Sequence, residues 1–189
     1  MHDILRYLFD MVISVAMLLI FIRFMLQFAG IDNKNPYAMP AYKATEVVDV
    51  FARIFPTVGD GRVSLAAIVL MFLLRLIDIS GSAALAGQGV SPIELFFYGS
   101  LTLILDFLSM CRYLIIASII ISWIVIFTQK MHPILGIIMQ LAEPILAPFR
   151  RILPNLGMLD LSPIIAFFVI YLVEEVVTVV AQNIVPMLG

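Results

Sequence analysis

Charged residues are scarce in this chain of 189 residues. Asp, Glu, Lys and Arg make up 13% of it, whereas 63% of its residues are hydrophobic. Average soluble domains carry about 25% charged residues, so there are too few polar side chains here to cover a water-facing surface. The mean hydropathy is +1.12, and the excess apolar surface requires contact with lipid. The composition therefore predicts an integral membrane protein whose first partner is the lipid bilayer.

Cysteine and histidine are also nearly absent. The one cysteine, Cys111, excludes an internal disulfide and any metal site built from several thiolates. His2 and His132 stand far apart, and neither an HExxH nor a CxxC motif occurs. A net charge of −2 gives no electrostatic reason to expect nucleic acid. We expect no enzymatic activity, no cofactor, no metal and no nucleic-acid partner.

Four apolar stretches are long enough to cross a bilayer as helices. They cover residues 7–28, 63–79, 104–127 and 161–184, and a short separate helix from Pro92 should precede the third. The first stretch could also be a signal peptide, but no small-residue cleavage site follows it, which favours a retained helix. The expected fold class is an all-α membrane protein with about four transmembrane helices.

The longest connection, residues 128–163, has prolines at 133, 144, 148, 154 and 163. Because Pro144 disfavours a helical Glu143, we expect two short helices, 133–142 and 144–153. The adjacent Arg150 and Arg151 should reach lipid headgroups. The segment either lies on the membrane surface or dips into the bilayer as a re-entrant hairpin, which protein would then have to enclose.

A weaker copy of this connection lies about 97 residues earlier, so the chain is expected to be a duplication. Pro36 corresponds to Pro133 and Glu46 to Glu143. Apolar residues recur at three- and four-residue steps over residues 40–55, which predicts an amphipathic helix at the membrane surface. The predicted units are residues 1–91 and 92–189, two parallel repeats in which a Pro-rich amphipathic linker helix follows a span.

The distribution of basic residues predicts the orientation. The connections after the first and third spans hold Lys34, Lys43, Arg53, Arg62, Lys130, Arg150 and Arg151, whereas the connection after the second span and the C-terminal tail hold none. Cytoplasmic loops are the ones enriched in Lys and Arg. Both long connections should therefore face the cytoplasm, and both termini should lie outside.

Some charges fall inside the predicted spans. Counting about 1.5 Å per residue from the cytoplasmic ends places Arg75, Asp78, Arg112, Glu174 and Glu175 in one layer of the outer half of the membrane. Lone charges at such depth are costly, so they should pair. We expect Arg75 to pair with Asp78, and Arg112 with Glu174 or Glu175. The remaining carboxylate is then either protonated or the proton- or cation-binding group of a pathway.

The segment EPILAPFRRILPNLGMLDLSP resembles the signature of the YggT family, carried here by Glu143, Pro144, Pro148, Arg150, Arg151, Pro154, Gly157 and Asp160. The resemblance implies a multi-pass protein of the bacterial inner membrane without established enzymatic activity. It also implies links to osmotic-shock tolerance, to envelope or division roles, and in plastid relatives to assembly of haem proteins. The first repeat departs from the pattern, since Ala52 stands where the signature has its first arginine, so we expect the second repeat to be the functional copy.

Two classes of function remain. One is an accessory or scaffold protein for a membrane complex. The other is an ion channel or transport subunit formed by oligomerisation. A scaffold needs its buried charges paired, whereas a pathway needs at least one facing water. Either class predicts a protein partner or a homo-oligomer in the membrane.

Overall fold

The computed structural model describes residues 2–152 and 160–184. Their elements are α1 (His2–Phe28), α2 (Met39–Ala44), α3 (Val47–Phe51), β1 (Thr57–Val58), β2 (Val63–Ser64), α4 (Leu65–Leu85), α5 (Pro92–Thr128), α6 (Pro133–Ile152) and α7 (Ser162–Ile184). Four of the helices, α1, α4, α5 and α7, are long and apolar enough to cross a membrane. The predicted fold class is confirmed.

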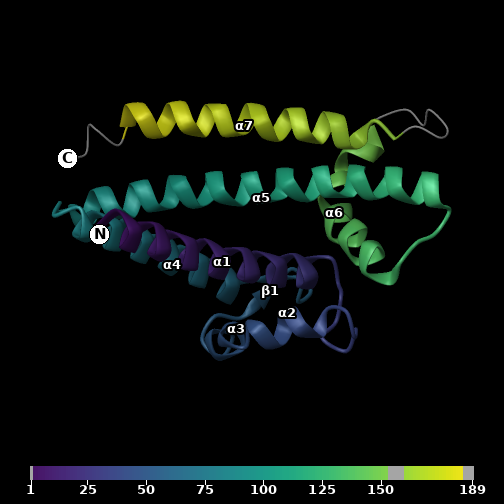
Figure 1. The fold of residues 1–189 in the computed structure, drawn as a ribbon, viewed down its shortest axis with the longest axis horizontal. Coiled ribbons are helices and arrows are strands. Elements are labelled where there is room, and N and C mark those ends of the chain that lie inside the picture. Colours follow the sequence, from purple (N-terminus) through teal and green to yellow (C-terminus); the bar gives the residue numbers. More distant parts are fainter. Residues whose placement is uncertain (1, 153–159, 185–189) are drawn as a thin grey trace.

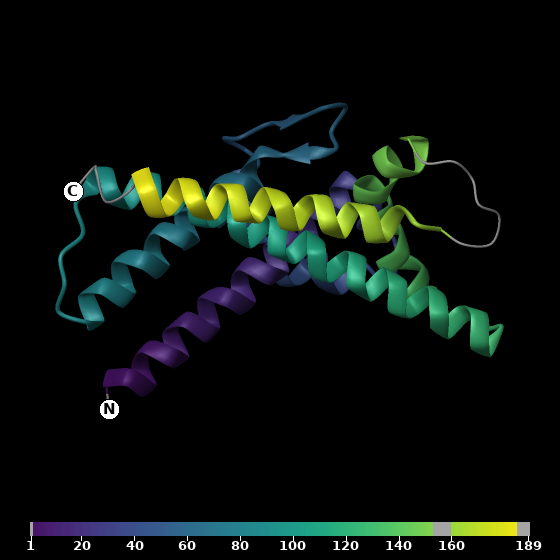
Figure 2. The ribbon, with the colours of Figure 1, turned by 90° about the horizontal axis from the view of Figure 1, so that it is seen from above.

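The long helix α5 lies at the centre of the arrangement. It has α7 along one side and α1 with α4 along the other (Figure 1), and α1 packs on α4, α4 on α5, and α5 on α7. The start of α1 and the end of α7 lie at the same end of this layer (Figure 1). The short helices α2 and α3 and the β1–β2 hairpin lie beside the opposite half of α1. Figure 2 shows α1 and α4 crossing α5 and α7 at an angle.

The second span is longer than predicted. Helix α4 continues past Ile79, the predicted end of this span, to Leu85, through several small residues. These residues form a helix contact, because a Cβ on Gly81 would lie 2.6 Å from the Phe9 ring of α1. Small residues permit such close approach between membrane helices, and packing against α1 keeps this segment helical.

The separate helix predicted to start at Pro92 is wrong, since α5 is a single helix of 37 residues. Ser91 caps its start by accepting a hydrogen bond from the Glu94 amide, and Pro92 suits the first helical turn. A helix of this length measures about 55 Å, whereas the apolar core of a bilayer is about 30 Å thick. Helix α5 must therefore tilt or extend beyond the core.

The single amphipathic helix predicted over residues 40–55 is also wrong. The segment forms α2 and α3, separated by Thr45 and Glu46. The Thr45 hydroxyl donates a 2.6 Å hydrogen bond to the Ala41 carbonyl, the kind of local bond that competes with helix continuation. The β1–β2 hairpin that follows was not predicted, although an Asp60–Gly61 pair between valines is typical of a hairpin turn.

Helix α6 is continuous from Pro133 to Ile152, with Pro144 and Pro148 inside it. The predicted break at Glu143 is therefore wrong. A proline inside a helix removes one hydrogen bond and bends the axis, and the ribbon of α6 changes direction along its length (Figure 2). Packing holds the bent helix together, because Ile137, Leu141, Ala142 and Leu146 are buried and α6 contacts α5 and α7.

Candidate functional site

Arg75 of α4 joins that helix to α5. Its Nη1 lies 2.7 Å from Asp78 Oδ2, and its Nε lies 3.2 Å from Asp106 Oδ2. The same Nε donates a 3.1 Å hydrogen bond to Thr102 Oγ1 on α5. One guanidinium thus contacts two carboxylates and a hydroxyl across the helix interface. The pair with Asp78 is the expected one, whereas Asp106 and Thr102 were missed.

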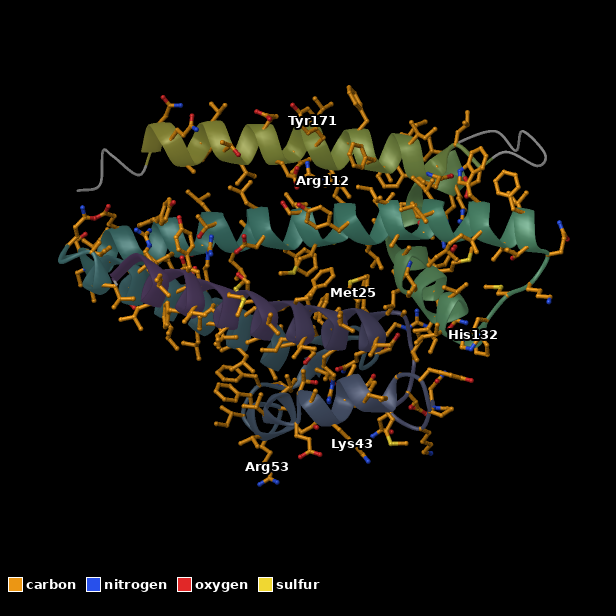
Figure 3. The ribbon with its side chains drawn as sticks, in the orientation of Figure 1. Met25, Lys43, Arg53, Arg112, His132 and Tyr171 are labelled. Carbon is orange, nitrogen blue, oxygen red and sulfur yellow. The ribbon has the colours of Figure 1, made fainter. Side chains whose placement is uncertain are left out.

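Arg112 joins α5 to α7. Its Nη1 lies 2.7 Å from Glu174 Oε2, and Figure 3 shows Arg112 between the two helices. The Ser109 hydroxyl donates to the other Glu174 oxygen at 3.0 Å. Glu174 is only 8% exposed, so both of its carboxylate oxygens are used inside the protein. Of the two glutamates expected as partners for Arg112, the structure pairs Glu174.

These charges form two clusters in the structure, and their expected position in one layer of the membrane stays a prediction. Asp106 and Arg112 are six residues apart on α5, which corresponds to about 9 Å along the helix axis. Counting residues assumed that every span runs parallel to the membrane normal, whereas the helices cross (Figure 2). Asp106 was missed because it lies near the outer end of the range predicted for the third span.

A further polar contact lies near the N-terminal end of α1. Arg6 Nε is 3.9 Å from Asp10 Oδ2, and the Ser82 hydroxyl of α4 donates to Asp10 at 2.7 Å.

Glu175, next to Glu174, is exposed. In the described ranges 2–152 and 160–184, no Lys or Arg forms an ion pair with Glu175.

The signature residues meet at Arg150, near the end of α6. Its guanidinium forms ion pairs with Glu143 and, at 2.8 Å, with Asp160. Arg150 is thus engaged by two carboxylates while 40% of its side chain stays exposed, and Arg151 is exposed. The contact of both arginines with lipid headgroups stays a prediction. Pro144 and Pro148 lie inside α6. Pro154 and Gly157 fall outside the described residues.

Asp160 connects this cluster to the start of α7. Its Oδ1 accepts a 2.9 Å hydrogen bond from the Ser162 amide, where α7 begins. Burial alone would raise the pKa of Asp160, but hydrogen bonds from Ser162 and Arg150 outweigh it and hold that pKa below its usual value. A carboxylate with a lowered pKa keeps its pairs at neutral pH and loses them only as the pH falls through that pKa. Arg150 and Asp160 therefore fasten the end of α6 to the first turn of α7.

A cleft of about 420 Å³ lies where α1 meets α2 and α3, and it was not predicted from the sequence. Its most buried charged side chain is Arg23, which is 6% exposed. Arg23 donates to Asp49 Oδ1 at 2.5 Å and to the Tyr42 carbonyl at 3.2 Å, and its guanidinium stacks 4.1 Å from the Tyr42 ring centre. Burial raises the pKa of Tyr42, although Arg23 partly offsets the effect. These contacts hold α2 and α3 against α1.

Within the residues that the structure describes, no three His, Cys, Asp or Glu side chains are grouped so as to hold a metal ion. Cys111 is buried. Four arginines of the described residues join neighbouring elements: Arg75 and Arg112 within the spans, Arg150 at the second linker, and Arg23 at the first.

Comparison with known proteins gives a family match over most of the chain. The family described as CCB3/YggT matches residues 2–83 and 97–181. The chain is 33% identical over 174 residues to an uncharacterized protein of Pseudomonas aeruginosa, which covers 90% of this chain and 86% of that protein. It is 26% identical over 180 residues to the uncharacterized protein YggT of Escherichia coli, covering 94% and 91% of the two chains. No solved structure matches.

Proposed function

Because the chain belongs to the CCB3/YggT family, we propose that it is a multi-pass protein of the bacterial inner membrane that acts as an accessory or scaffold protein. Its role is to help a membrane complex assemble, or to help the envelope withstand osmotic stress. In this proposal α1, α4, α5 and α7 cross the membrane, and the α2–α3 and α6 linkers face the cytoplasm. We assign no enzymatic activity to it.

The pairing of the charges within the spans carries this proposal. Arg75 and Arg112 each contact carboxylates of a neighbouring helix, which is what a rigid scaffold requires and what a water-filled pathway does not. The pairs join α4 to α5 and α5 to α7, and Arg150 adds a link from α6 to α7. These contacts would hold the linker surfaces in fixed positions for a partner.

A subunit of an ion channel or transporter is the second candidate. One observation favours it: Glu175 is an exposed carboxylate on an apolar helix. In an oligomer of these chains, that carboxylate could line a pathway. Ion flux through vesicles that contain only the purified protein, abolished by Glu175→Gln, would decide for this candidate over the scaffold.

The two halves of the chain are proposed to be a duplication, with the boundary between residues 91 and 92. Two observations support this. The family match falls into two segments, one on each side of that boundary, and each half contains a long pair of packed helices, α1 with α4 and α5 with α7. The proposal places the helix pairs in parallel orientation.

The topology is the first testable consequence. In a Cys111→Ser background, a cysteine at Gln88 should react with a membrane-impermeant maleimide added to intact spheroplasts. Cysteines at Lys43 and Lys130 should react only after the membrane is opened, because basic connections stay in the cytoplasm. Lys43 and Arg53 project away from α1 (Figure 3), so a reagent on that side would reach them. Labelling of Lys130 in intact spheroplasts would overturn the orientation.

The second consequence concerns the linkers. Combining Arg150→Ala with Arg151→Ala should remove most of the survival that the protein gives after osmotic shock to a strain lacking it. The variant should still insert, because exposed ion pairs contribute at most about 1 kcal/mol to stability. Combining Lys43→Ala with Arg53→Ala should have a smaller effect, since the first linker departs from the signature.

Single substitutions provide a matched control for that experiment. Arg150 holds both Glu143 and Asp160, whereas its neighbour Arg151 is exposed. Arg150→Ala alone should therefore reproduce most of the loss, and Arg151→Ala alone should reproduce little. Equal losses from the first and second linker would contradict the assignment of function to the second repeat.

A further inference from the structure

Helix α7 has one side that no other part of the described chain covers. It packs on α5 and α6, with Glu174 turned towards Arg112. Glu175 follows it in sequence and so lies about 100° further round the helix, where it is exposed. Figure 3 shows Tyr171, one turn from Glu175, on the side of α7 turned away from Arg112. The residues exposed around Glu175 are otherwise apolar: Phe168, Tyr171, Leu172, Val176 and Val179.

Glu175 lies near the middle of the apolar span. The span runs over Ser162–Asn183, so Glu175 is about 20 Å from its first residue and about 12 Å from its last. The hydrocarbon core is about 30 Å thick, and a glutamate side chain is too short to reach its edge from there. Ionisable residues at this depth face protein or water and pair with one another.

The chain itself offers Glu175 no cation. All eleven Lys and Arg residues of the sequence lie in the described ranges, and none of them pairs with Glu175 there. A second copy in the same orientation would present only Arg75 and Arg112 near this depth, and both are already paired with carboxylates. A basic side chain that pairs with Glu175 would therefore come from a different protein.

We propose that the exposed side of α7 around Glu175 binds a transmembrane helix of another membrane protein. That helix carries a Lys or Arg near mid-membrane. Glu175 pairs with that residue, and the surrounding aromatic and aliphatic side chains pack against the partner helix. The inference rests on the proposed scaffold function and gives the chemistry of its partner. It also explains why the sequence places two glutamates in succession: Glu174 pairs inside the chain and Glu175 pairs outside it.

A guest helix of known sequence tests the proposal. The full chain, with Cys111→Ser and a donor dye on a cysteine at Gln88, is reconstituted in phosphatidylcholine vesicles. Synthetic Leu/Ala transmembrane peptides carry an acceptor dye and, at their midpoint, Lys, Gln or Glu. Energy transfer should show the Lys peptide binding about tenfold more tightly than the Gln peptide. Glu175→Gln should abolish that preference, whereas Glu46→Gln, at an exposed linker glutamate, should keep it.

Reversing the charge at position 175 gives a test that does not depend on how well one variant folds. Glu175→Lys should reverse the preference and bind the Glu peptide over the Lys peptide. A preference for Lys that survives Glu175→Gln would overturn the inference, as would equal binding of all three peptides. Association between copies of the chain that depends on Glu175 would assign the face to a second copy instead. The scaffold function would stand or fall separately, on the osmotic-shock survival of the linker variants.

Discussion

Replacing Arg112 with leucine should lower the free energy of unfolding by about 2–4 kcal/mol. The substitution leaves Glu174, which is 8% exposed, with a single hydrogen bond from Ser109 and no counter-charge. A carboxylate inside the protein then has to be neutralised or exposed, and either costs free energy. Unfolding of the purified protein in mixed micelles, followed by circular dichroism, would measure the loss.

A second substitution separates the ion pair from the packing of Arg112. Adding Glu174→Gln to Arg112→Leu should recover about half of the loss, because the amide carries no charge and can still accept the bond from Ser109. Arg6→Leu is the matched control, since Arg6 is half exposed and 3.9 Å from Asp10; such pairs contribute under about 1 kcal/mol. A double variant no more stable than Arg112→Leu would refute the pairing as the source of the effect.

The four membrane helices could be predicted because length and apolarity alone define a helix that crosses a bilayer. The pairs Arg75–Asp78 and Arg112–Glu174 could be anticipated for a related reason. Charges within apolar helices are few, and each requires a partner. These predictions depend on local composition, which the sequence displays directly.

What the sequence could not reveal depends on how helices pack. Pro144 has a strong local preference against a helical Glu143, yet α6 continues because Leu141 and Ala142 beside it are buried. Helix α4 extends past Ile79 because Gly81 meets Phe9 of α1. Arg150 turns to Asp160 because α6 ends near the start of α7. In each case a tertiary contact decides against a local preference.

The pairing of Asp106 with Arg75 is another contact that could not be predicted from the sequence. The distance between Asp106 and Arg75 depends on where α5 crosses α4. Counting residues along each helix does not give the position of that crossing. The sequence did show an aspartate inside the long apolar stretch of residues 93–129. An intramembrane carboxylate of this kind is by itself reason to look for a partner, and Arg75 is the partner that the fold supplies.

Arg75 should therefore be the most sensitive position of the chain. Arg75→Leu leaves Asp78 and Asp106 without a cation and Thr102 without its donor, and we expect a loss of about 3–5 kcal/mol. Arg75→Lys keeps the charge, but one ammonium cannot reproduce the guanidinium geometry that reaches Asp78 through Nη1 and Asp106 through Nε. We expect it to lose about half as much as Arg75→Leu. The unfolding assay used for Arg112 gives both values.

Because of where Arg75 lies, limited proteolysis provides a second measurement of its effect. Arg75 fastens α4 to α5, one of the contacts that join the two halves of the chain, so its loss should loosen the connection over residues 86–91 between them. Limited proteolysis there should accelerate in Arg75→Leu, and Asp78→Asn with Asp106→Asn in the same chain should slow it again by removing both unpaired charges. Arg112→Leu should leave cleavage of this connection unchanged, because it acts between α5 and α7. Equal cleavage of Arg75→Leu and the wild-type chain would show that packing around Gly99, where a Cβ would lie 2.6 Å from Leu76, holds the halves together without the ion pairs.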